Sequence, residues 1–337
     1  MFEETRMDPL THVVAGYVVG SAGGGGEVEI ATAFLASLTP DVEFITRKIP
    51  RTAFLDYHHG LTHTVFGGIL AAVGIAAVIG WITKIPLLSL FPFALAGIAS
   101  HIMLDLLMHN NGIALWAPFS RKRVAFPLVL GLNPRTASKH CKDGRYGTCL
   151  VCQAHGAVFN PFLWVLGIST LIGLIKPPLR QPTAVLALVL LFIYSLVALS
   201  RKYRVWRLLP DESPGVSRRK VFPASFDLWT WLSVCETDSE FKSSLVNVRK
   251  NDIIRTDFFP KHSPPSVVEK SESMLSVRGF QNSVIFPYWI HESKNDIDHI
   301  IWRDLSYSFS NDVELYTLHI KIDTNGTIIQ NEFHERW

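Results

Sequence analysis

The sequence has 337 residues, of which 48% are hydrophobic and only 18% are charged. A chain of this length can hold two domains, but the composition is too apolar for one ordinary soluble fold and indicates a membrane protein. The formal net charge of +3 is small, and we expect no direct binding to nucleic acid.

The first apolar stretch, residues 10–40, predicts a helical hairpin. Its two apolar halves are separated by residues 23–27, which read Gly-Gly-Gly-Gly-Glu. Neither half reaches the roughly 20 residues that a straight helix needs to cross a bilayer. We therefore expect a hairpin partly buried in protein. The chain starts with acidic residues and His12 lies in the first half, so we expect no cleavable secretory signal.

Four longer apolar stretches predict transmembrane helices. About 20 residues at a rise of 1.5 Å per residue cover a hydrocarbon core of about 30 Å. None of the four contains Asp, Glu, Lys or Arg, and they are 64–83, 85–104, 156–175 and 181–200. The expected fold of residues 1–210 is a mostly α-helical integral membrane domain, with the helical hairpin plus four transmembrane helices.

Residues 221–337 predict a soluble β-rich C-terminal domain. Polar and aromatic residues are interspersed there, and the alternation over residues 313–322 is typical of a half-buried strand. Residues 323–326 read Asp-Thr-Asn-Gly, which predicts a hairpin turn into a further strand over residues 327–333.

The basic residues predict the orientation of the chain. Segment 107–155 contains seven Lys and Arg residues against one acidic residue, and segment 201–220 contains seven more against two. The opposite connections offer only Lys84, Lys176 and Arg180. Because basic loops stay on the cytoplasmic side, we expect a multi-pass membrane protein with a basic cytoplasmic loop 107–155 and a cytoplasmic C-terminal domain.

Histidine and aspartate residues gather where the expected helices end. His12 and Asp41 lie at the two ends of the hairpin. His58 and His63 precede the predicted helix 64–83, and His101 and Asp105 lie at the end of the predicted helix 85–104, which returns to the same membrane face. Ionisable groups near a membrane are costly unless they are paired, hydrated or bound to metal, so all six are candidate ligands that meet at one face. The candidate metal ligands are His12, Asp41, His58, His63, His101 and Asp105.

Four of these six residues also have a simpler explanation. His101 and Asp105 are four residues apart on one helix face. This spacing suits two ligands of one ion, and it suits equally a hydrogen bond between the two side chains without an ion. His12 alone is compatible with a solvated histidine, and Asp41 after Pro40 with a turn residue or a helix N-cap. Their expected arrival at the same face favours a shared site.

The order of these motifs resembles a known family. The motifs are Asp-Pro-Leu-Thr-His at 8–12, Pro-Asp at 40–41, the segment 58–64, Ser-His-x-x-x-Asp at 100–105, and 112–119 with Gly112 and Leu-Trp-Ala-Pro-Phe. Together they resemble the membrane-bound predicted metal-dependent hydrolases that include a LexA-associated bacterial inner-membrane protein. The resemblance covers residues 7–207 closely and the tail loosely, and it implies the same six ligands and the inner membrane.

The sequence departs from the family pattern beside the expected ligands. His59 replaces an arginine, Thr64 a serine and Glu43 an aspartate, and Ala117 separates a Trp-Pro pair. These departures leave the ligand set intact. They change the residues around it, because His59 cannot supply the permanent charge of a guanidinium toward a phosphate.

The ligand types favour Zn²⁺, Mn²⁺ or Fe²⁺ over Ca²⁺ or Mg²⁺, which prefer oxygen ligands. Four histidines and two aspartates exceed one tetrahedral sphere, so either two ions are bound or some of the six only support the ligands. Glu43 and His59 are the candidate catalytic proton-transfer residues. The basic residues 121–123 favour an anionic amphiphile as substrate, such as a phospholipid or isoprenoid phosphate, although such residues often only set topology.

A second candidate metal site lies in the basic loop. The spacing Cys-x7-Cys-x2-Cys-x2-His contains the close pair typical of structural zinc sites, although its first interval is not a standard one. Its residues are Cys141, Cys149, Cys152 and His155, and Cys235 is expected to be an unpaired buried thiol.

Three classes of function remain open at this point. The leading one is a membrane-bound metal-dependent hydrolase acting on a phosphoester or lipid-like substrate at the cytoplasmic membrane surface, with membrane lipids as partners. The alternative is a membrane scaffold or regulatory protein with a structural metal site, whose C-terminal domain binds a cytoplasmic protein partner. A metal or proton pathway ranks third, because the candidate ligands lie at helix ends rather than near mid-membrane.

Overall fold

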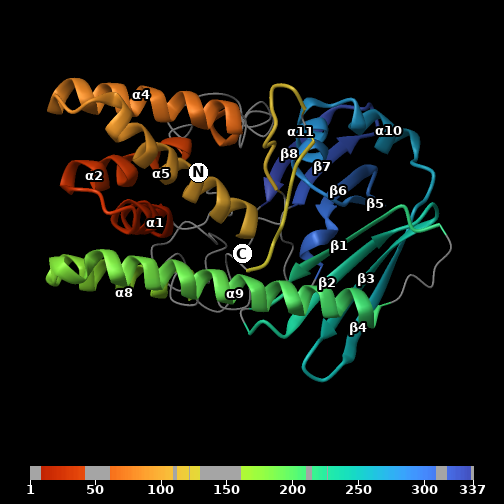
Figure 1. Ribbon diagram of the computed structural model, residues 1–337. Coiled ribbons are helices and arrows are strands. Elements are labelled where there is room, and N and C mark those ends of the chain that lie inside the picture. Colours follow the sequence, from red (N-terminus) through yellow and green to blue (C-terminus); the bar gives the residue numbers. More distant parts are fainter. Residues whose placement is uncertain are drawn as a thin grey trace.

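The computed structural model describes residues 9–41, 61–108, 112–120, 122–129, 161–209, 215–225, 227–308 and 317–334. Within these residues, helices form the first part of the chain and two antiparallel sheets form the last (Figure 1). The change of character after residue 220 that the composition predicts therefore coincides with a change of secondary structure.

The predicted helical hairpin is present and lies between two longer helix pairs (Figure 1). The helices are α1 (Pro9–Ala22), α2 (Glu27–Ala36), α4 (Val65–Thr83), α5 (Leu87–Met108), α8 (Pro161–Ile175) and α9 (Arg180–Leu208). The helices α4 and α5 pack against α2, α5 also packs against α1, and α8 and α9 pack against the other side of the hairpin at α1. The backbone of the hairpin is thus covered by protein, as a segment too short to span a bilayer requires.

Small residues let the hairpin pack closely. Gly24 has a φ of +71°, a left-handed conformation that glycine adopts without strain, in the turn between α1 and α2. A side chain at Gly97 of α5 would collide with the backbone oxygen of Ala33 on α2. The close approach of α2 and α5 therefore depends on glycine at this position.

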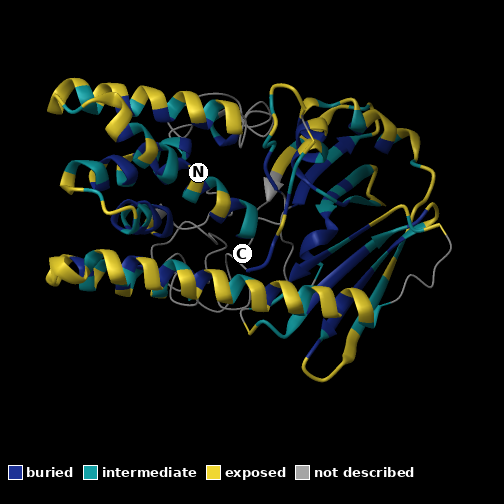
Figure 2. Ribbon diagram, in the orientation of Figure 1, coloured by how far each residue is buried: buried dark blue, intermediate teal, exposed yellow. Residues whose placement is uncertain are grey.

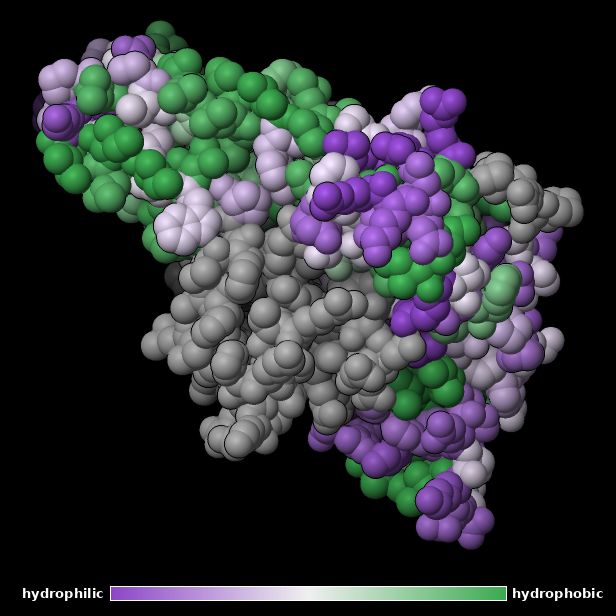
Figure 3. Space-filling model, turned by 90° about the horizontal axis from the view of Figure 1, so that it is seen from below, coloured by the Kyte–Doolittle hydropathy of each residue, from purple (hydrophilic) through white to green (hydrophobic). Residues whose placement is uncertain are grey.

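Among the described residues, three helices are long and apolar enough to cross a membrane: Val65–Thr83, Leu87–Met108, and Pro177–Leu208, in which the short helix η3 (Pro177–Leu179) leads into α9. The remaining predicted span is described only from Pro161 onward as α8, which has 15 residues, so the count of four spans stays a prediction. Hydrophobic residues gather over the helical part of the surface in Figure 3, and hydrophilic residues over the part formed by the strands.

The C-terminal region consists of two four-stranded antiparallel sheets, ordered β1-β2-β3-β4 and β5-β6-β7-β8. The first contains β1 (Arg218–Pro223), β2 (Thr230–Glu236), β3 (Glu240–Asn247) and β4 (Asp252–Pro260). The second contains β5 (Pro287–Lys294), β6 (Ile297–Asp304), β7 (Thr317–Asp323) and β8 (Ile328–His334), and the helix η4 (Leu305–Tyr307) follows β6.

The predicted turn after Asp323 is confirmed, and it leads into β8. The predicted strand over 313–322 is described from Thr317 onward, and residues 313–316 lie outside the described residues. Two short helices between the sheets, α10 (Ser266–Glu272) and α11 (Leu275–Ser283), were not predicted.

The C-terminal region has its own hydrophobic core. Phe280 of α11 is fully buried with Phe222 of the first sheet and Ile300 and Trp302 of the second. Figure 2 shows buried residues along the strands of both sheets. The helix α9 extends beyond its predicted end, and its Val205 packs in one buried cluster with Trp231 of β2. One continuous helix thus connects the membrane part with the sheets.

Candidate metal centre

Five of the six predicted ligands lie together, at the end of the helices nearest the sheets (Figure 1). They come from four separate places in the chain: His12 on α1, Asp41 after α2, His63 in the short helix η2 (Leu61–His63), and His101 and Asp105 together on α5. The other predicted site residues lie outside the described residues: Glu43, His58, His59, Cys141, Cys149, Cys152 and His155.

His101 lies at the centre of this cluster. Its Nε2 atom is 3.2 Å from Nε2 of His63, 3.2 Å from Oδ2 of Asp105 and 3.7 Å from Oδ1 of Asp41. The ring of His12 stacks on the ring of His101 with centroids 3.7 Å apart. His101 therefore contacts every other member of the cluster.

Asp105 and Asp41 contact the remaining histidines. His63 Nε2 is 3.4 Å from Oδ2 of Asp105 and 3.8 Å from Oδ1 of Asp41, and His12 Nε2 is 3.5 Å from Oδ1 of Asp105. The cluster divides into two groups that share His101. The inner group is His12, His101 and Asp105, and the outer group is Asp41, His63 and His101.

These distances fit the edges of a metal coordination sphere. Two nitrogen ligands at about 2.0–2.1 Å from a tetrahedral ion are about 3.3–3.4 Å apart. Within each group, the candidate ligand atoms all lie within 4.8 Å of one another. With neutral imidazoles, the two carboxylates carry a charge of about −2 that a divalent cation would balance. The described residues can therefore hold a divalent ion in either group, and His101 Nε2, which both groups share, can ligate one ion at a time.

The tautomer of His101 requires a proton or a metal ion beside its Nε2. Its Nδ1 lies 2.7 Å from the backbone oxygen of Ser37, and because a carbonyl oxygen only accepts, Nδ1 carries a proton. In neutral His101, Nε2 then presents a lone pair toward Oδ2 of Asp105. Two lone pairs face each other stably only when a proton or a metal ion lies between them.

Burial differs between the two groups. His12, His63, His101 and Asp105 are all buried, whereas the Asp41 side chain is 23% exposed. The inner group is therefore enclosed by protein, and the outer group reaches the surface at Asp41.

Neighbouring residues fix the ligands. Thr62 Oγ1 is 3.0 Å from Nδ1 of His63, and the Thr64 hydroxyl accepts from the Gly67 amide at 2.9 Å, which caps the start of α4. The carbonyl of Ser37 holds His101 in the way just described. Sequence reasoning did not identify Ser37, because a backbone acceptor leaves no mark in the residue type.

A further segment connects the elements that carry the ligands. The amide of Val65 at the start of α4 donates to the Leu115 oxygen at 3.0 Å. The amides of Phe126 and Leu128 donate to the oxygens of Leu106 and Leu107 near the end of α5, at 3.1 and 2.8 Å. Residues 112–129 thus link the start of α4, two residues after His63, to the end of α5 beside Asp105.

Comparison with known families agrees with a membrane protein. A family model described as "YdjM inner membrane protein" matches residues 7–205, more than half of the 337 residues, so the chain belongs to this family. No curated protein and no solved structure matches the chain significantly. The matched range includes all five described members of the cluster.

Proposed function

We propose that this member of the YdjM inner membrane protein family is a membrane-bound metal-dependent hydrolase, acting on a phosphoester or lipid-like substrate at the cytoplasmic membrane surface. One observation carries the proposal. Five ligand-type side chains from four places in the chain meet in a mostly buried cluster, with His63 and His101 presenting Nε2 atoms 3.2 Å apart. Such a convergence of ionisable groups in a membrane protein favours a functional site over isolated surface residues.

The two groups of the cluster are alternative positions for an ion that His101 ligates, and they suit different roles. The inner group, His12, His101 and Asp105, is enclosed and suits an ion held for structure or charge. The outer group includes the partly exposed Asp41, as a catalytic site that keeps an open position requires. An ion in the outer group would act as a Lewis acid and would lower the pKa of a bound water toward about 7.

Residues of the chain would orient the ligands, supply negative charge and transfer protons. Ser37 holds Nδ1 of His101 so that Nε2 faces the cluster, and Asp105 supplies negative charge to His101 and His63. Glu43 and His59 remain the predicted proton-transfer residues, since they follow Asp41 and precede His63 in the sequence.

The position of the cluster favours a membrane-derived substrate. It lies at helix ends beside the apolar α4, and exposed Lys122 lies on the segment that links α4 to α5. A phosphate on an apolar chain matches a cationic side chain next to an apolar helix surface. We propose the inner membrane as the location, with the C-terminal sheets and the basic loop 107–155 in the cytoplasm.

A screen of phosphoester and lipid hydrolysis on the purified full chain tests the activity. We expect hydrolysis of the substrate that a chelator abolishes and that added divalent metal restores. The variant His101→Ala should be inactive, whereas His262→Ala, which removes an exposed histidine in the C-terminal region, should keep full activity. Activity that is insensitive to chelator and to His101→Ala would contradict a metal-dependent mechanism.

A membrane scaffold with a structural metal site and a protein partner is the second candidate. It is favoured by the edge strand β4, which exposes the apolar residues Ile253, Ile254 and Phe258. In that case, metal removal should lower thermal stability in detergent, and no hydrolysis should be detected in any screen.

A further inference from the structure

A short turn after α5 exposes two large aromatic side chains. The turn contains Leu115, Trp116, Ala117, Pro118 and Phe119, which we call the aromatic turn. Trp116 is 56% exposed and Phe119 is 84% exposed. Neighbouring exposed aromatic residues on a well-defined turn indicate a contact surface, because scattered single ones are the ordinary case.

The aromatic turn continues the apolar surface of a membrane-spanning helix. The Val65 amide, at the start of α4, donates to the Leu115 oxygen at 3.0 Å, and the rings of Phe66 and Phe119 meet edge to face with centroids 6.3 Å apart. Phe66 is exposed and begins an apolar face of α4 that continues through Leu70. Lipid that covers this face of α4 therefore ends beside Phe119.

The opposite end of α4 gives the distance to the other membrane surface. There Trp81 is 75% exposed, and the Lys84 ammonium lies 5.7 Å from its ring centre. Tryptophan and lysine at a helix end are typical of a membrane–water interface. The 19 residues of α4 span about 28 Å, close to the hydrocarbon thickness of about 30 Å, so the aromatic turn stands at the other interface.

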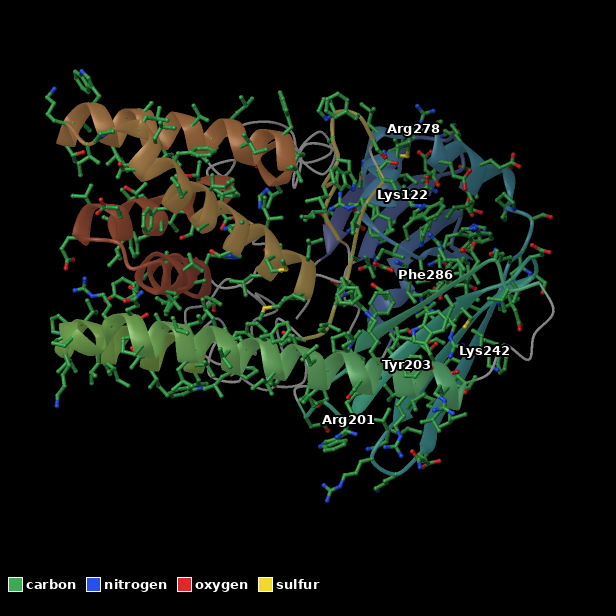
Figure 4. The ribbon with its side chains drawn as sticks, in the orientation of Figure 1. Lys122, Arg201, Tyr203, Lys242, Arg278 and Phe286 are labelled. Atoms are coloured by element: carbon green, nitrogen blue, oxygen red, sulfur yellow. The ribbon has the colours of Figure 1, made fainter. Side chains whose placement is uncertain are left out.

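The charges beside the turn suit lipid headgroups. Exposed Lys122 follows the turn and is labelled in Figure 4. The Arg123 guanidinium donates to the Gly112 oxygen at 2.8 Å, and Ile113 pairs with Val124, which closes the base of the turn. A fixed turn with aromatic rings at its tip and a lysine beside them matches the amphipathic headgroup layer.

We propose that the aromatic turn is a membrane anchor that inserts Trp116 and Phe119 into the phospholipid headgroup layer, in the leaflet at the end of the helices that holds the His/Asp cluster. Because Val65 follows His63 by two residues, the same turn sets the depth of the cluster relative to the lipid. The anchor does not depend on hydrolase activity, since it rests on exposed residues outside the cluster.

Photo-crosslinking in vesicles tests the anchor. The full chain carries the photoreactive amino acid p-benzoylphenylalanine in place of Phe119 and is reconstituted with phosphatidylethanolamine and phosphatidylglycerol, a fraction of them labelled. The same replacement at Phe66, on the lipid-facing surface of α4, is the positive control. Replacement at Phe258, which is 58% exposed on β4, is the matched negative control.

The anchor predicts labelled lipid adducts at position 119 in a yield close to that at position 66 and at least about tenfold above that at position 258. Adducts at position 66 without adducts at position 119 would overturn it. An adduct between position 119 and another protein, or a second copy of this chain, would also overturn it, because the aromatic turn would then be a protein interface.

Discussion

The Nε2 atoms of His101 and His63 lie 3.2 Å apart although 38 residues separate the two histidines in the chain. His63 belongs to the short helix before α4, and His101 to the second half of α5. The antiparallel packing of α4 and α5 therefore brings both rings to the same membrane face, where Asp105 and Asp41 also contact them.

Asp105→Asn should separate a role in the site from a role in folding. The amide keeps the size of the carboxylate but loses the charge that faces His12, His63 and His101. We expect about a 10–100-fold loss of metal affinity or of hydrolysis, because this is the usual cost of losing such a carboxylate. Metal titration and activity assays on the purified variant measure the effect.

The helices should remain inserted in Asp105→Asn, which membrane fractionation checks. Full metal content together with unchanged hydrolysis would remove Asp105 from the site. A loss of thermal stability in detergent, with no activity in the unaltered chain, would instead favour the structural metal of a scaffold.

Reporter fusions test the orientation of the chain. A reporter fused after Trp337 should be cytoplasmic, because the positive-inside rule predicts that the basic segments 107–155 and 201–220 stay on that side. A reporter inserted in the Gly23–Gly26 turn should lie on the opposite side. The reverse pair of results would contradict the proposed orientation and would place the His/Asp cluster outside the cytoplasm.

The burial of Phe280 predicts a large stability effect in the C-terminal region. Phe280 is fully buried between the two sheets, and Leu275 on the same helix α11 is 70% exposed. Phe280→Ala should destabilise the fold of this region by about 3–5 kcal/mol, and Leu275→Ala should change it by less than about 0.5 kcal/mol. Denaturant unfolding of the full chain, followed by circular dichroism of the strands, compares them, and equal effects would contradict this core.

Asp304 predicts a pH dependence of stability in the same region. Burial raises the pKa of the Asp304 carboxyl above its ordinary value, although donors from Ser306 and Phe286 oppose the shift. The folded state then holds the proton more tightly than the unfolded state. The contribution of Asp304 to stability is therefore highest below the ordinary carboxyl pKa of about 3.9, and it falls as the pH rises through the folded pKa of Asp304.

Asp304→Asn should remove this part of the decline, because the amide cannot ionise. Unfolding midpoints at a series of pH values compare the variant with the unaltered chain, and Asp238→Asn, at an exposed position, is the control. If Asp304→Asn shows the same fall in stability with rising pH as the control, the buried carboxyl is not its source.

The sequence predicted the parts of this fold that depend on local composition. The apolar lengths of α4 and α5 follow from the bilayer thickness, and the turn at Asp323 follows from turn chemistry. The helix α11 was not predicted, because its apolar residues Val277 and Phe280 pack in one cluster with residues of both sheets, and local composition does not show this packing. The basic end of α9 continues as helix because Val205 packs against the first sheet, which is a tertiary effect.

The candidate site shows the same division. The spacing of His101 and Asp105 predicted their contact on one helix face. His101 Nε2 lies 3.2 Å from Oδ2 of Asp105. Topology predicted that His12, Asp41 and His63 would arrive at the same end. The stacking of His12 on His101 and the bond from His101 to the Ser37 oxygen depend on how α1, α2 and α5 pack, and no local pattern encodes that packing.

The metal content of the purified full chain decides whether the His/Asp cluster binds a divalent metal ion. Elemental analysis after dialysis, on the unaltered chain and on His101→Ala, compares a complete cluster with one that lacks the residue common to both groups. We expect one or two divalent ions of zinc, manganese or iron per unaltered chain. The variant His101→Ala should contain almost none, and His262→Ala should contain as much metal as the unaltered chain. An unaltered chain that binds no divalent metal tightly, or a His101→Ala variant that keeps the full content, would contradict this expectation.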